Sequence, residues 1–171
     1  LKDSHEQKQA AESLYNRHQT FMERLFCALF ISLQWTDADQ SFFENLLISP
    51  LISREDALLI TSALMLATLN VYDERKWVAL TNVYLRASDE QLRQRALIGW
   101  VLTSHPQTDF FKKQQTIFNS LLMNANTRSE LLELQKQIFF CLNAEKDNAT
   151  IRKDIIPDMM KGSYLHMGQF G

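Results

Sequence analysis

Apolar residues recur along this chain at intervals of three and four, the spacing that places them on one face of an α-helix. In one segment, Trp77, Leu80, Thr81 and Tyr84 stand at i, i+3, i+4 and i+7. No stretch sustains the alternation of apolar and polar residues that is typical of a half-buried strand. The pattern therefore predicts an all-α protein of about eight helices. These helices are expected over residues 3–33, 37–48, 54–70, 73–86, 89–104, 108–124, 128–143 and 148–163.

The segment 54–70 is apolar on nearly all sides, whereas the neighbouring segments have one apolar face each. A helix that is apolar all round is covered by other helices on several sides. We therefore expect 54–70 at the centre of the fold. Pro157 falls inside the last predicted helix and is expected to kink it or end it early.

Helix-start signals divide the chain into units. Ser88 and Thr127 each stand three residues before an amide or acidic side chain, which is the capping-box pattern, and Thr36 and Ser53 head similar sequences. The segments 53–86 and 88–122 align at an offset near 35, and a third unit begins near Thr127. Short connections make successive helices antiparallel. The repeated pattern predicts antiparallel helical hairpins stacked as an α-solenoid.

The 171 residues are enough for one domain with a sizeable core, and no linker-like stretch divides them. We therefore predict a single helical-repeat domain over 1–163 and a flexible tail over 164–171. The polar start without Met indicates a piece of a longer protein. The most apolar stretch, 25–33, is about half the length that crosses a bilayer.

The formal net charge of −2 gives no overall attraction to nucleic acid or to an anionic membrane. The cysteines Cys27 and Cys141 each lie in an apolar run, so we expect two buried, reduced thiols. Together these features favour a cytoplasmic protein that binds neither nucleic acid nor membrane.

The segment 88–102, SDEQLRQRALIGWVL, resembles a HEAT-type helix. It has an acidic start, then an Arg, then small and apolar residues, with Leu92-Arg93 where the family usually has Val-Arg. The resemblance covers residues 37–163 in architecture and about 15 residues in motif. The chain is also similar to segments of large bacterial helical-repeat proteins. The HEAT-like resemblance implies scaffolding or partner binding, on a groove lined by the second helix of each hairpin.

Motifs of catalysis and cofactor binding are absent from the sequence. It contains no His-Glu-x-x-His, no Cys-x-x-Cys, no Gly-rich phosphate loop and no Gly-x-Ser-x-Gly. None of the four histidines has a His, Glu or Cys partner at i+4 on a helix. The acidic pairs cluster at helix starts, where the helix dipole favours them. Gly99, inside a predicted helix, is expected to allow a close approach of two helices. We expect a non-catalytic protein without metal or cofactor.

A protein or peptide partner is the leading expectation. The candidate partner-binding residues are Trp77 and Tyr84, because Trp and Tyr dominate interface hot spots, together with the basic doublet Lys112 and Lys113. Exposed apolar ends of the solenoid are further expected to permit self-association.

Two other functions stay open at this point. A ligand-binding or enzymatic helical bundle would have an internal pocket with convergent titratable groups, and His18, Glu23 and Glu44 are its first candidates. A purely structural element would have its open ends capped by other parts of the chain or by a second copy.

Overall fold

The computed structural model of the chain describes residues 2–104, 112–150 and 153. It divides into two units, Leu1–Thr108 and Asp109–Gly171, which we describe separately as unit 1 and unit 2. The predicted all-α class is confirmed, because the described residues form seven helices and no strand. The single repeat domain over 1–163 with a tail over 164–171 stays a prediction.

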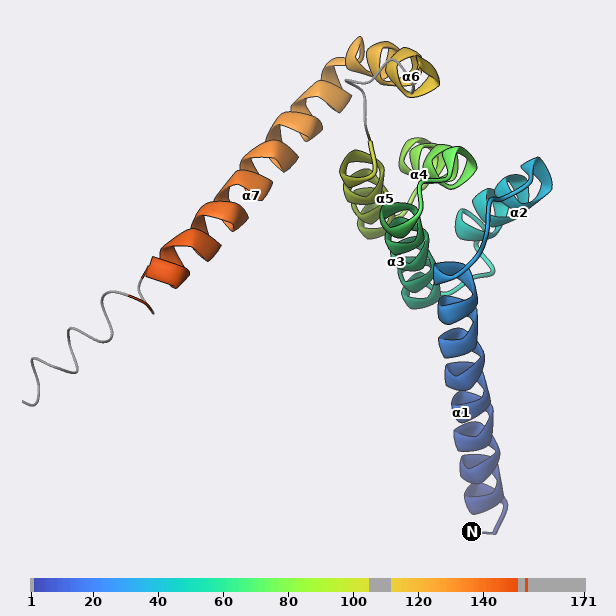
Figure 1. The fold of residues 1–171 in the computed structure, drawn as a ribbon. Helices are drawn as coiled ribbons and strands as arrows, with labels where there is room; N and C mark the ends of the chain where they lie inside the picture. Colours follow the sequence, from blue (N-terminus) through green and yellow to red (C-terminus); the bar gives the residue numbers. More distant parts are fainter. Residues whose placement is uncertain (1, 105–111, 151–152, 154–171) are drawn as a thin grey trace, which may run out of the picture. The chain divides into compact units, whose positions relative to one another are not determined.

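The described part of unit 1 consists of five helices (Figure 1). Most of their ends agree with the sequence prediction to within two residues, and the first helix ends three residues earlier than expected. The helices are α1 (Lys2–Phe30), α2 (Asp37–Leu47), α3 (Arg54–Asn70), α4 (Glu74–Arg86) and α5 (Glu90–Leu102).

Helix α3 is the centre of unit 1, as its all-apolar sequence predicts. It packs against α1, α2, α4 and α5, and Ala63 and Leu64 near its middle are fully buried. Packing also links every second helix, since α1 lies on α3, α3 on α5, and α2 on α4 (Figure 1). The core of the unit therefore lies around α3, between the α1–α3–α5 row and the α2–α4 row.

The helix starts of unit 1 are fixed by side-chain caps. Thr36 forms the complete capping box with Asp39, and the Ser53 hydroxyl accepts from the backbone N–H of Asp56, so both predicted caps are confirmed. The predicted cap at Ser88 is wrong. The N-cap of α5 is instead the next residue, Asp89, whose carboxylate accepts from the N–H of Leu92.

Five polar contacts tie the helix pair α1–α2 to the helix pair α3–α4 at a constant sequence distance. Each of the five joins residues 38 positions apart, so that the two pairs, which we call the first and the second hairpin of unit 1, lie side by side in register. The contacts are His18 Nε2 to Asp56 Oδ2 (3.0 Å), Gln34 Nε2 to the Tyr72 carbonyl (2.9 Å), the Trp35 N–H to Asp73 Oδ2 (2.7 Å), Arg75 Nε to Asp37 Oδ1 (2.6 Å) and Asn82 Nδ2 to Glu44 Oε1 (2.8 Å).

A buried ion pair lies at the centre of this register. Lys76 is 1% exposed, its Nζ lies 3.6 Å from Asp73 Oδ2, and it donates to the carbonyls of Ser32 (2.9 Å) and Leu33 (3.1 Å). Burial lowers the pKa of the Lys76 ammonium, and the Asp73 carboxylate opposes that shift. Asp73 also caps α4, so one carboxylate holds the start of α4 against the α1–α2 connection.

Unit 2 is a helical hairpin of α6 (Lys112–Leu122) and α7 (Ala125–Thr150), which pack against each other. The predicted cap at Thr127 is wrong, because Thr127 lies inside α7. The Asn124 side chain accepts instead from the N–H groups of Asn126 and Thr127. Helix α7 continues through residues 148–150, where the eighth helix is predicted to begin, and nearly all the rest of that predicted helix lies outside the described residues.

Among the residues that the structure describes, no helix is both long enough and apolar enough to cross a bilayer.

Candidate partner-binding groove

An open groove lies on unit 1 where α1, α2, the α2–α3 connection and the start of α3 meet. Its volume is about 830 Å³, and most of the side chains along it are apolar. We call it the α1–α2 groove. It is lined by His18, Phe21, Met22, Leu25, Phe42, Phe43, Asn45, Leu46, Ser49, Leu51, Ile52, Ser53, Asp56 and Ile60.

The α2 wall of the groove is the end of an aromatic stack. The Phe42 ring meets the Phe43 ring edge-on with centroids 5.1 Å apart, and Phe43 stacks on Trp35 at 4.8 Å. Behind them, the buried Lys76 ammonium lies 5.7 Å from the centre of the Trp35 ring, within the range of a cation–π contact. Since Trp35 is buried and Phe42 is 60% exposed, Phe42 is the accessible end of the stack.

Large apolar side chains of the groove are open to solvent. Phe21 of α1 is 60% exposed, and Leu51 in the α2–α3 connection is 94% exposed. Together with Phe42 they come from three different parts of the chain. Exposed apolar groups concentrated in one concave site are typical of a surface that binds a partner or a ligand.

A histidine–carboxylate pair lies at the edge of the groove. His18 of α1 and Asp56 of α3 approach to 3.0 Å, with side chains that are 47% and 18% exposed. The nearby serines form hydrogen bonds with the backbone, because Ser53 caps α3 and the Ser49 hydroxyl accepts from the N–H of Leu51. The arrangement orients α1 on α3 beside the groove and offers one polar anchor there.

Two of the four predicted partner-binding residues are buried. Trp77 is 0% and Tyr84 is 2% exposed, so neither side chain is accessible to a partner on the surface of unit 1. Tyr84 stacks on Trp100 with centroids 5.6 Å apart, and the indole N–H of Trp77 donates to the Ser104 hydroxyl at 3.0 Å. The apolar face that contains Trp77 and Tyr84 packs inward against α5, which sequence periodicity alone does not reveal.

The basic doublet belongs to unit 2. Lys112 is exposed at the start of α6, and the side chain of Lys113 lies outside the described residues. Their role in partner binding stays a prediction.

The titratable groups proposed for an enzymatic pocket do not converge. Glu23 is exposed on α1, and Glu44 is buried between α2 and α4, where it accepts from Gln40 Nε2 and Asn82 Nδ2, both at 2.8 Å. His18 meets Asp56 instead of either of them. Glu44 therefore connects two helices, and the groove receives only the His18–Asp56 pair from the charged residues.

The expectation of buried thiols is wrong, because Cys27 and Cys141 are both exposed. Each thiol lies on the solvent side of its helix, although the apolar residues around it in the sequence favour burial. In the part of the chain that the structure describes, no group of three or more His, Cys, Asp and Glu side chains is placed to hold a metal ion.

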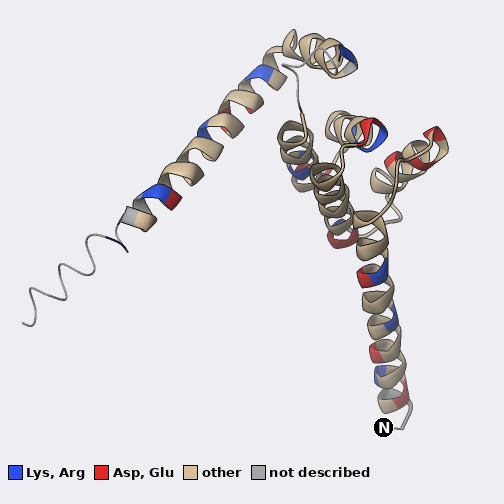
Figure 2. Cartoon of the chain, viewed as in Figure 1, with Lys and Arg blue, Asp and Glu red and all other residues tan. Residues whose placement is uncertain are grey.

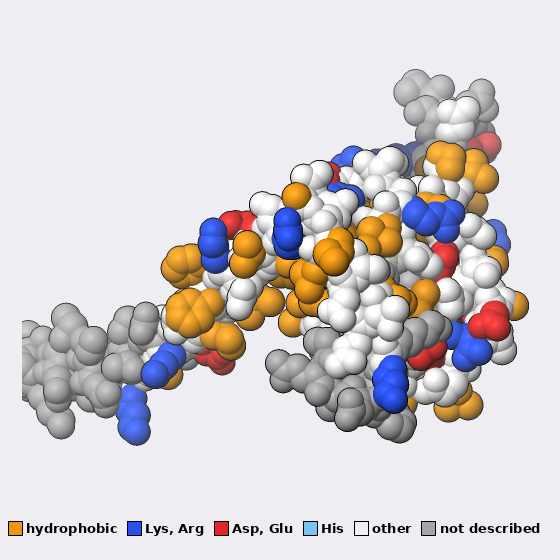
Figure 3. Space-filling view, turned by 90° about the horizontal axis from the view of Figure 1, so that it is seen from above, with side chains coloured by type: hydrophobic (Ala, Val, Ile, Leu, Met, Phe, Trp, Pro, Cys, Tyr) orange, Lys and Arg blue, Asp and Glu red, His pale blue; other side chains and the backbone are white. Residues whose placement is uncertain are grey.

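Unit 2 has an apolar surface of its own on α7, where hydrophobic side chains stand out along the helix in the space-filling view (Figure 3). Exposed fractions are 57% for Leu132, 62% for Phe139, 69% for Phe140 and 61% for Leu142. This surface is convex, because it belongs to a single helix.

The groove was missed in the sequence because its residues come from separate segments. Phe42 and Phe43 are adjacent aromatics in a short helix, so at most one can occupy the centre of a helical face. Leu51 directly follows Pro50 in a connection, where an apolar side chain has no helical face to join. These two irregularities were the available signals.

Comparison with protein-family models, with curated proteins and with solved structures gives no match for this chain. The function is therefore argued from the chain's own residues.

Proposed function

We propose that this chain is a non-catalytic protein-binding or scaffold module of the HEAT-like α-solenoid type, and that the α1–α2 groove of unit 1 receives the partner. The observation that carries the proposal is the concentration of exposed apolar side chains, Phe21, Phe42 and Leu51, in one open groove. Burying such side chains provides about 25 cal/mol per Å² of apolar surface removed from water.

The hairpin arrangement supports the same proposal. Every second helix packs side by side, and five of the polar contacts between the two hairpins join residues 38 positions apart. Each is a feature of stacked helical hairpins, in which neighbouring units complete one another's core. Such modules bind other proteins on a surface that their rigid helices hold in place.

The test compares two matched variants in capture experiments from the native lysate. Leu51→Glu places a charge in the groove, whereas Leu33→Glu makes the same change at a comparably exposed leucine (94% against 88%) that does not line it. We expect partners identified by mass spectrometry to be retained by wild type and by Leu33→Glu, and lost from the groove variant. Recovery of the same proteins with all three would reject the groove as the binding site. Circular dichroism on each variant checks that the fold is intact.

A ligand-binding bundle is the second candidate, and the His18–Asp56 pair favours it. A volume of about 830 Å³ lies in the range of small-molecule sites, and the pair would fix one polar group of an otherwise apolar ligand. Native mass spectrometry of the purified protein tests it. A bound small molecule that is lost from His18→Ala would favour this candidate, and the absence of any bound mass would count against it.

A further inference from the structure

A second, shallower hollow runs along α1 beside the α1–α2 groove, and Phe21 belongs to both. Arg17 and Arg24 stand four residues before and three residues after Phe21, so that all three share one face of the helix. The hollow is lined by Gln9, Glu12, Ser13, Asn16, Arg17, Thr20, Phe21 and Arg24. The groove therefore continues along α1 as a surface with two cations.

These two cations differ from most other arginines of unit 1. Arg54, Arg75 and Arg86 each face a carboxylate, at 2.7, 2.6 and 3.6 Å. Among the described residues, Arg17 and Arg24 have no ion-pair partner, and charged residues of both signs are spread along α1 (Figure 2). Glu12 is the one carboxylate that lines the same hollow, which leaves an excess of positive charge beside Phe21.

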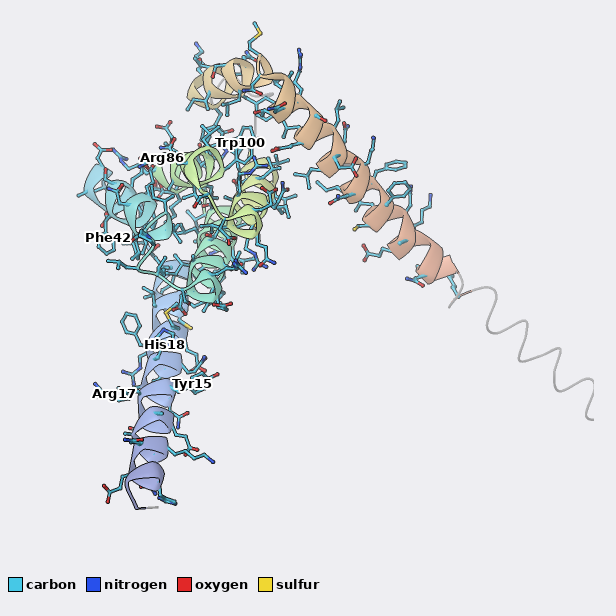
Figure 4. All side chains as sticks on the ribbon, turned by 180° about the vertical axis from the view of Figure 1, so that it is seen from behind. Tyr15, Arg17, His18, Phe42, Arg86 and Trp100 are labelled. Carbon is cyan, nitrogen blue, oxygen red and sulfur yellow. The ribbon has the colours of Figure 1, made fainter. Side chains whose placement is uncertain are left out.

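The side-chain view (Figure 4) places Arg17 on the side of the groove. Arg17 points to the side of α1 toward which α2 and Phe42 lie, whereas Tyr15 points to the other side (Figure 4). A partner seated on Phe42 and Phe21 would therefore pass within reach of Arg17.

The walls of the groove determine the backbone conformation that a bound segment can have. Helices α1 and α2 bond their main-chain groups internally, so they offer no strand edge to which an extended peptide could add. A segment that enters an apolar groove must then satisfy its own N–H and C=O groups, which an α-helix does. From Gln9 to Leu25 the surface on α1 is roughly 24 Å long, which corresponds to a partner helix of about 16 residues.

We propose that the α1–α2 groove and the adjoining face of α1 bind an amphipathic α-helix with an acidic flank. Its large apolar side chains contact Phe21 and Phe42 in the groove, and its carboxylates pair with Arg17 and Arg24. The proposal rests on the proposed function and names the chemistry of the partner.

The experiment uses the full chain and two designed helical peptides of about 16 residues. Both have Leu at i, i+3, i+4 and i+7, and one has Glu along a flank where the other has Lys. Fluorescence anisotropy of labelled peptides, shown to be monomeric by sedimentation, measures binding. We expect the Glu peptide to bind about tenfold more tightly than the Lys peptide at low salt, and this difference to shrink as ionic strength rises.

Charge reversal provides the matched comparison. Arg17→Glu with Arg24→Glu is expected to invert the order of the two peptides. Arg128→Glu with Lys136→Glu makes the same charge change on α7 of unit 2 and is expected to leave the order unchanged. Phe42→Glu is expected to weaken both peptides.

The outcomes separate this inference from the proposed function. The acidic partner is overturned if both peptides bind equally, or if the order of their affinities stays the same when both arginines are reversed. In that case, loss of peptide binding in Phe42→Glu would still support the groove as a binding site. Binding of neither peptide overturns the helical partner, and the groove itself is then judged by the lysate capture. A wild-type dimer that Phe42→Glu dissociates would assign the groove to a second copy and overturn the inference as well.

Discussion

The second hairpin of unit 1, α3–α4, is closed because α5 covers it. The first hairpin, α1–α2, is open because the α1–α2 groove lies beside it. Counted from the N-caps Thr36 and Asp73, Phe42 and Phe43 of α2 stand at the positions of Ala79 and Leu80 of α4. Ala79 and Leu80 are both 0% exposed, whereas Phe42 is 60% exposed and lines the groove. Positions at the same distance from a helix N-cap can therefore serve as core in one helix and as surface in another.

The difference follows from the helix that comes next. Helix α4 packs closely on α5, where Gly99 leaves room for it, since a Cβ at this glycine would lie 3.3 Å from Leu80 Cδ2 and from Met65 Cβ. The prediction that Gly99 allows a close helix approach is thereby confirmed. Helix α2 packs on α4 and α3, and it leaves the α1–α2 groove open beside it.

The largest effect is expected where the two hairpins are joined. Asp73→Ala removes the cap of α4, the acceptor for the Trp35 N–H and the charge opposite the buried Lys76. Breaking a buried ion pair from one side costs about 3–5 kcal/mol, and we expect the free energy of unfolding of unit 1 to fall by that amount in urea titrations. Asp73→Asn keeps an acceptor oxygen and is expected to cost less. A loss below about 1 kcal/mol for the alanine variant would show that this pair does not hold the hairpins together.

A direct comparison of the two positions comes next. Leu80→Ala is expected to destabilise unit 1 by about 2–5 kcal/mol, because it leaves a cavity in a closed core. Phe42→Ala removes a larger but exposed side chain and one edge-on aromatic contact, so we expect a loss of about 1 kcal/mol. Both are measured by urea denaturation under one set of conditions. Equal losses would mean that the open hairpin is as well packed as the closed one.

The close packing of α5 on the second hairpin is tested by substitutions of Gly99. Gly99→Leu overfills the contact with Leu80 and Met65 and is expected to cost about 1–3 kcal/mol. Gly99→Ala gains about 1 kcal/mol of helix propensity but crowds the same atoms, so we expect a small net change. Thermal unfolding followed by circular dichroism compares the two. A leucine that is tolerated without loss would show that α4 and α5 can separate freely.

The smallest expected effect is on the pH dependence of stability in acid. The N–H of Leu92 and the guanidinium of Arg54 lower the pKa of the Asp89 carboxyl from 3.8. Because the folded-state pKa is the lower one, this contribution to stability is complete above pH 3.8 and is lost as the pH falls through the lowered value. Asp89→Asn is expected to flatten the fall in urea midpoint below pH 3.8. Asp39→Asn tests the open hairpin in the same way, since the pKa of Asp39 is lowered by Thr36. A profile unchanged by either substitution would contradict this account.

Much of the fold could be predicted from local pattern. The segment 54–70 was placed correctly to the residue, because a strongly apolar helix and the Ser53 cap mark both its character and its start. The capping roles of Asp73, Asp89 and Asn124 were missed, since several neighbouring polar residues can each cap a helix and tertiary contacts select one.

The candidate site was largely beyond sequence reasoning. Periodicity identifies an apolar face but not what covers it, so Trp77 and Phe42 looked alike until α5 was found against one and solvent against the other. The pairing of His18 with Asp56 joins residues 38 positions apart, and only the fold brings them together.

The reach of the helix contacts has a mechanical consequence. The helix pairs that pack together in unit 1 are at most two helices apart along the chain. A pulling force applied to the ends of this unit would therefore load one helix at a time, and α1, which packs mainly on α3, would give way before α3, α4 and α5. The buried Asp73 carboxylate would be the last contact between the two hairpins to break. Extension would then proceed in steps, and the highest force peak would mark the separation of Asp73 from Trp35 and Lys76.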